Sequence, residues 1–273
     1  MASSLHPTSH QKPIYTLLRV LLFYSLSVAI LLFTSRLTKS LPTTVANLLS
    51  IALASLLTFL LVVGFTRWEK LHLSDVGVIP GSQSAKRFVT GYLIGLSMAV
   101  MQAIIVLFFG RLHLVFNPHM AAVEISLSAL LYLLVACREE LAFRAYALRS
   151  LSNSITSAFA LLIIIVIFIG EHILAGMNWM TAVIGSGLGG ILFGIAALKT
   201  RGLALPLGLH SSWNFGQWMI GFKNKPGIWE AIVDKGYEAK TEAIGLAAFA
   251  LVMVLAILAV SILYKVKKKS DSL

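Results

Sequence analysis

The chain has 273 residues, of which 58% are hydrophobic and 12% are charged. An ordinary soluble domain has about 25% charged and about 45–50% apolar residues, so this composition excludes that class and indicates a polytopic membrane protein. The formal net charge of +11 does not indicate nucleic-acid binding, because basic residues in such proteins usually record orientation across the bilayer. The single cysteine, Cys137, excludes an internal disulfide and a thiolate metal cluster.

Eight apolar stretches approach the length of about 20 residues that a helix needs to cross a bilayer. The first is too long for a cleavable signal peptide, and no small-residue cleavage site follows it. We therefore predict an all-α fold, with residues 1–273 as a single integral-membrane domain of about eight transmembrane helices. In chain order the stretches are Ile14–Thr34, Val45–Phe65, Phe88–Phe109, Ile125–Leu148, Ile155–Ile173, Ala182–Leu198, Leu203–Phe222 and Ala243–Tyr264.

Basic residues in the loops predict the orientation of these helices. With an even number of spans, the basic residues of the second loop, the sixth loop and the C-terminus fall on one side, and the positive-inside tendency makes that side cytoplasmic together with both termini. The seventh loop, on the opposite side, partly contradicts this orientation because it also carries lysines, although acidic residues are mixed with them. The first group is Arg67, Lys70, Lys86, Arg87, Lys199, Arg201, Lys265, Lys267, Lys268 and Lys269, and the second is Lys223, Lys225, Lys235 and Lys240.

The first candidate functional motif is Glu139-Glu140 with Arg144, directly after the apolar run Leu127–Val135. Each charge at the centre of a membrane helix costs about 2.5–3.5 kcal/mol, so a cluster of three indicates a function. Glu140 and Arg144 are four apart and share a helix face, which favours an ion pair, whereas Glu139 points about 100° away. We interpret Glu140 and Arg144 as a structural clamp and Glu139 as a general base. Alternatively, the helix ends near Val135 and its charges lie in the cytoplasmic interface.

Two further pairs of residues lie four apart in later apolar segments. Phe168 and His172 share a face of the fifth, where the histidine is either a core residue or an acid, base or ligand. His210 and Asn214 share a face of the seventh, and their N–H groups are suited to stabilise an oxyanion. Together with the glutamates, these residues are typical of a hydrolytic site.

In their order and spacing, these motifs resemble the CPBP family of intramembrane proteases, also called the CAAX protease or Abi family. Its hallmarks E-E-x-x-x-R, F-x-x-x-H and H-x-x-x-N/D occur without a departure, and the resemblance covers about Val123–Phe222. It implies an eight-helix fold with a catalytic core at 123–222, in spans four to seven. It also implies endopeptidase activity like that of the enzyme that removes the last three residues of prenylated CAAX proteins.

The resemblance also implies roles for individual residues. Glu139 and His172 would activate the attacking water, and His210 and Asn214 would form the oxyanion hole. Glu140, Arg144 and Phe168 would support the site. The expected partners are a membrane-associated protein or peptide substrate and the lipid bilayer, with no nucleic acid.

Other interpretations remain open. In a zinc-dependent version of the same protease, Glu139, His172 and His210 would bind the metal and leave a position for water. We favour a mechanism with no cofactor, because the compact H-E-x-x-H signature is absent and Arg144 would repel a dication. A catalytically silent immunity or scaffold protein and a proton-coupled transporter are the alternatives from other classes, although inverted repeats are not evident.

The depth of the site follows from the positions of its residues along their helices. At about 1.5 Å per residue, Glu139 and His172 lie about 21 and 28 Å from the turn near Asn153, whereas His210 lies only about 14 Å from Arg201. These depths agree only if the fourth–fifth turn projects beyond the bilayer or a helix tilts or kinks. We predict a site below the cytoplasmic surface.

Overall fold

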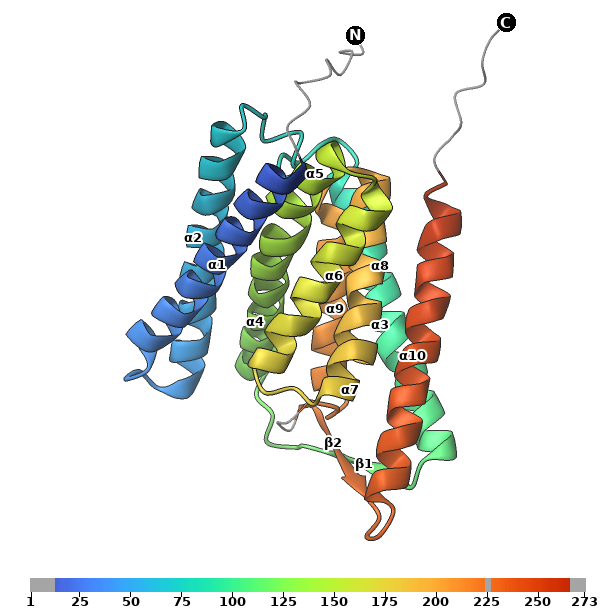
Figure 1. Ribbon diagram of the computed structural model, residues 1–273. Helices are drawn as coiled ribbons and strands as arrows, with labels where there is room; N and C mark the ends of the chain where they lie inside the picture. Colours follow the sequence, from blue (N-terminus) through green and yellow to red (C-terminus); the bar gives the residue numbers. More distant parts are fainter. Residues whose placement is uncertain (1–12, 224–226, 266–273) are drawn as a thin grey trace, which may run out of the picture.

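The computed structural model describes residues 13–223 and 227–265. Within these ranges the chain is an antiparallel bundle of eight helical segments (Figure 1). Two segments are interrupted by a π-helical turn but continue through it. In chain order the eight are α1 (Pro13–Thr38), α2 (Thr43–Trp68), α3 (Ser84–Phe109), α4 (Ala122–Glu140) with η1 (Leu141–Ala145) and α5 (Tyr146–Ser154), α6 (Ser157–Leu174), α7 (Trp179–Thr181) with η2 (Ala182–Ser186) and α8 (Gly187–Thr200), α9 (Ala204–Met219), and α10 (Glu238–Leu263).

The predicted all-α architecture is confirmed, and the protein is a multi-pass membrane protein. By length and composition, six segments can cross a membrane: α1, α2, α3, α6, Trp179–Thr200 and α10. The remaining two, α4 and α9, are two of the three helices that carry the motifs. α4 has Arg138, Glu139 and Glu140 at its end, and α9 has 16 residues, most of them buried. The charged residues of α4 and the short length of α9 distinguish these two helices from the six.

Two short strands were not predicted. β1 (Leu112–Phe116) and β2 (Trp229–Val233) pair antiparallel, with Leu112 opposite Val233. Figure 1 shows this ribbon at the end of the bundle away from the start of α1. The sequence assigned both segments to loops because each run is only five residues long and its pairing partner lies more than 100 residues away. The ribbon joins the loop after α3 to the loop before α10.

Glycines bring α3 and α9 into close contact. A Cβ added to Gly91 would lie 2.4 Å from the carbonyl oxygen of Leu205, and one added to Gly208 would lie 2.2 Å from that of Phe88. Only a residue without a side chain allows two helix backbones to approach so closely. This contact sets the position of α9, and therefore of His210 and Asn214.

The helix directions place one set of basic residues together. The loop after α2, the start of α3 and the loop after α8 lie at the same end of the bundle as the start of α1 and the end of α10 (Figure 1). Lys70, Lys86 and Arg201 are at this end, and Lys265 follows α10. Among the residues used to predict orientation, Lys225, Lys267, Lys268 and Lys269 lie outside the described ranges.

Candidate active site

The helix that carries the two glutamates does not end near Val135. α4 runs to Glu140 and continues through η1, all five residues of which are buried. A π-helical turn inserts an extra residue into the hydrogen-bonding pattern and often occurs at functional sites. Here the turn immediately follows Glu139 and Glu140, and it contains Arg144, which is completely buried.

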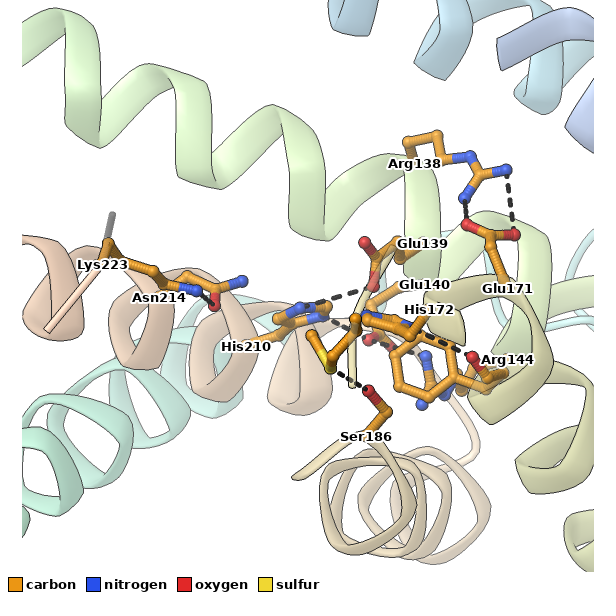
Figure 2. Close-up of polar contacts among 12 residues, drawn as sticks. Arg138, Glu139, Glu140, Arg144, Glu171, His172, Ser186, His210, Asn214 and Lys223 are labelled. Carbon is orange, nitrogen blue, oxygen red and sulfur yellow. Dashed lines mark hydrogen bonds and ion pairs between the residues drawn. The ribbon is translucent and has the colours of Figure 1, made fainter. Parts of the chain in front are cut away.

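Glu140 is bonded to a histidine from a distant helix. Its Oε1 accepts a hydrogen bond from Nδ1 of His210 on α9 at 2.9 Å, and Nη1 of Arg144 donates to the same oxygen at 3.4 Å. Figure 2 shows this contact between the two helices. The predicted Glu140–Arg144 ion pair is therefore confirmed. The carboxylate also orients His210, a role that the spacing along one helix did not reveal.

Glu139 faces the other nitrogen of the same ring. Its Oε2 lies 3.6 Å from Nε2 of His210, just beyond hydrogen-bond distance. This oxygen is buried and has no hydrogen-bond partner within the described residues. The two neighbouring carboxylates thus meet opposite nitrogens of one imidazole, and Glu139 retains an oxygen able to accept a proton.

Aromatic rings enclose the histidine and the arginine. The His210 ring stacks on Phe193 of α8, with centroids 4.4 Å apart and an angle of 13° between the planes. The Arg144 guanidinium lies 4.5 Å from the centroid of the Phe168 ring, a cation–π contact. Phe168 therefore contacts the cluster, as does Phe193, which was not predicted.

His172 joins the site through Phe168 rather than through a glutamate. The two rings make an edge contact with centroids 4.5 Å apart, and Nδ1 of His172 lies 2.9 Å from the Phe168 carbonyl oxygen. A carbonyl only accepts, so Nδ1 carries a proton, and a ring with no second proton has a free lone pair on Nε2. Within residues 13–223 and 227–265, His172 makes no hydrogen bond to Glu139 or His210.

Asn214 lies one turn beyond His210 on α9. Its Oδ1 accepts a hydrogen bond from Nζ of Lys223 at 3.0 Å (Figure 2). An ammonium group can only donate, so this contact fixes the amide with its Nδ2 hydrogens directed away from Lys223. The sequence analysis used Lys223 only as a basic loop residue that bears on orientation. Its contact with Asn214 could not be predicted, because it depends on the path of the chain after α9.

A second ion pair adjoins the motif residues. Arg138, next to Glu139, pairs with Glu171, next to His172. The hydroxyl of Tyr24 on α1 donates to Oε2 of Glu171 at 2.7 Å, so the network joins α1, α4 and α6. This ion pair was not predicted from the sequence. A lone glutamate at the end of the very apolar α6 nevertheless indicates that a charged partner lies nearby.

The depths from the straight-helix count did not predict which residues meet. Glu139 and His210 are in contact, although counting residues put them at different distances from their turns. η1 interrupts regular α-helical geometry between Glu140 and the turn after α5, and α5 extends to Ser154, beyond the predicted end at Leu148. A regular rise of 1.5 Å per residue does not hold across such a turn.

The residues do not form the ligand set that a catalytic zinc takes. Three protein ligands are usual. Within the part of the chain that the structure describes, no three His, Cys, Asp or Glu side chains lie close enough together to bind one ion. Of the three residues proposed as ligands, only Glu139 and His210 face each other.

Comparison with known proteins supports the resemblance stated from the motifs. Residues 121–216 match the family model described as type II CAAX prenyl endopeptidase Rce1-like. The matched range begins just before α4 and ends within α9, so it includes every motif residue. No curated protein matches the chain. Residues 121–216 are therefore an Rce1-like type II CAAX prenyl endopeptidase (CPBP/Abi) family domain.

Proposed function

We propose that this protein is an intramembrane endopeptidase that hydrolyses a peptide bond in a membrane-associated protein, with a prenylated CAAX-type C-terminus as the substrate class. The observation that carries the proposal is the buried contact of Glu139 and Glu140 with the two nitrogens of His210. Buried charges are retained in membrane proteins mainly for function. The family match over residues 121–216 supports the choice of reaction.

Glu139 and His172 activate the water in this proposal. Glu139 has a buried carboxylate oxygen without a hydrogen-bond partner among the described residues, and His172 has a lone pair on Nε2. As the water oxygen attacks the carbonyl carbon, its proton passes to one of these two groups. The same proton then moves to the leaving nitrogen as the C–N bond breaks. Because the two side chains are not hydrogen-bonded to each other, substrate and water must bridge them.

His210 and Asn214 stabilise the negative charge that develops on the carbonyl oxygen. Nδ1 of His210 donates to Glu140, and in its protonated form the ring offers a second N–H, at Nε2, to the oxyanion. Lys223 holds the Asn214 oxygen, which leaves the amide hydrogens free for the substrate. Donors that are already oriented stabilise the transition state without reorganisation.

We also propose that the reaction needs no metal cofactor and that both termini are cytoplasmic. The lack of a three-residue ligand set among the described residues supports the first proposal. The basic residues gathered at one end of the bundle support the second.

The test is cleavage of a farnesylated CAAX peptide by the purified protein in detergent. We expect removal of the last three residues, a fall of at least about 100-fold in kcat for Glu139→Gln and for His172→Gln, and unchanged activity with a chelator. Matched controls are Glu242→Gln and His119→Gln, which change the same residue types away from the site. Full activity in both site variants would refute the residue roles, and loss of activity with chelator, restored by zinc, would refute the metal-free mechanism.

A further inference from the structure

We infer that a crevice between the start of α3 and the end of α10 binds the phosphodiester headgroup of an anionic phospholipid. The crevice has a volume of about 380 Å³ and is separate from the candidate active site. It is lined by Gln83, Lys86, Arg87, Thr90, Leu263 and Tyr264.

The polar part of the crevice is cationic. Both charged residues that line it are basic, and no acidic residue among those that the structure describes does so. Lys86 is exposed, and within the described residues its ammonium makes no hydrogen bond or ion pair. Arg87 donates from Nη1 to the carbonyl oxygen of Thr200 at 2.9 Å, which holds the guanidinium in place and leaves its other N–H groups for a ligand.

The backbone adds to this positive potential. α3 begins at Ser84, and no side chain caps its first turn. Unpaired N–H groups and the helix dipole favour an anion at this position. The cations lie within the same turn, so the side chains and the backbone act together on one small volume.

The position of the crevice suits a lipid rather than a soluble anion. α3 and α10 both have the length and composition of membrane-spanning helices, and the crevice lies where one begins and the other ends. Leu263 and Tyr264 supply an apolar wall beside the cations. A tyrosine at such a helix end is typical of the membrane interface. Basic pockets between transmembrane helices at this level bind anionic headgroups.

The experiment is native mass spectrometry of the detergent-purified protein titrated with phosphatidylglycerol or phosphatidylcholine of identical acyl chains. The test variant is Lys86→Gln with Arg87→Gln. The matched control is Arg67→Gln with Lys70→Gln, which removes the same charge at the same end of the bundle but at the end of α2. Lys86→Gln alone leaves the Arg87–Thr200 contact intact and decides the question if the double variant does not fold. Glycerol phosphate is titrated as a soluble anion, to distinguish binding of a lipid headgroup from binding of a free phosphate.

We expect the wild-type protein to bind phosphatidylglycerol in preference to phosphatidylcholine. The affinity for phosphatidylglycerol should fall about fivefold in Lys86→Gln and roughly 25-fold in the double variant, from the usual contribution of a cation near an anionic lipid surface. The control should bind as the wild type does. Equal binding of the two lipids, an equal loss in both double variants, or binding of glycerol phosphate as tightly as the lipid would overturn the inference.

Discussion

Glu139 and Glu140 are adjacent in the sequence but have different surroundings. Glu140 is 1% exposed and contacts both His210 and Arg144, whereas Glu139 meets only Nε2 of His210, at 3.6 Å. A carboxylate that accepts hydrogen bonds from both a histidine and an arginine is part of the folded framework. Each glutamate has one buried oxygen without a hydrogen-bond partner in the described part of the chain, but Glu139 accepts no hydrogen bond there at either oxygen, so its carboxylate is the one available for chemistry.

The two glutamates should therefore differ in their effect on stability. Glu140→Gln leaves Arg144 as an unpaired buried cation and should lower the free energy of unfolding by about 3–5 kcal/mol as well as reducing cleavage. Glu139→Gln removes no hydrogen bond and should change the free energy of unfolding by less than about 1 kcal/mol while reducing cleavage to the same degree or more. Denaturant unfolding in detergent, run beside the cleavage assay, measures both. Equal stability of the two variants would contradict this assignment.

Lys223 should act through the orientation of Asn214. Lys223→Met removes the donor that holds Oδ1, so the amide can rotate, and we expect kcat to fall about tenfold with little change in KM. Lys223→Arg retains a donor without an acceptor and should restore most of the activity. Steady-state measurements of kcat and KM compare the two variants. The control is Lys235→Met, which changes a lysine in a loop away from the site. A rise in KM alone would indicate that Lys223 contacts the substrate directly.

At the scale of helices, the site depends on how closely α9 approaches α3. Gly91→Ala places a Cβ 2.4 Å from the Leu205 carbonyl oxygen, a backbone atom that cannot move aside without shifting the helix. We expect a loss of about 1–3 kcal/mol in the free energy of unfolding and a lower kcat, because α9 carries His210. Gly64→Ala in α2 is the control, since nothing lies within 4 Å of its added Cβ. Similar stability of the two variants would show that α3 and α9 tolerate a wider separation.

The Arg138–Glu171 pair links α4 to α6 beside the motif residues. Glu171→Gln leaves Arg138, a residue that is 1% exposed, without its counter-charge. We expect a loss of about 3–5 kcal/mol in the free energy of unfolding. Changing both residues to Met removes the unpaired charge, so the double variant should be more stable than Glu171→Gln. A double-mutant cycle of unfolding free energies, built from Arg138→Met, Glu171→Met and the double Met variant, measures the coupling, and additive losses would contradict a direct pairing.

At the scale of the whole molecule, the orientation in the membrane can be measured with single cysteines. In a Cys137→Ala background, Ser82→Cys lies in the loop between α2 and α3, and Lys235→Cys lies between β2 and α10. If the basic end is cytoplasmic, an impermeant maleimide added to intact cells should label Lys235→Cys, and Ser82→Cys only after permeabilisation. The opposite pattern would reverse the proposed orientation.

The sequence alone determined the features that depend on local patterns. Apolar runs predicted an all-α membrane protein, and spacing along one helix predicted the Glu140–Arg144 ion pair. The three motifs predicted the family whose model matches residues 121–216. Each of these inferences uses residues near each other in the chain or a recurring motif.

The tertiary structure alone decided which of these residues meet. Glu140 and His210 are 70 residues apart, and their contact depends on the glycine-mediated approach of α3 and α9 and on the π-helical turn after Glu140. The β1–β2 ribbon, the Arg138–Glu171 pair and the Lys223–Asn214 bond likewise join segments whose separation no periodic pattern encodes. Local spacing specifies which face of a helix a side chain occupies, but the packing of backbones decides what lies opposite that face.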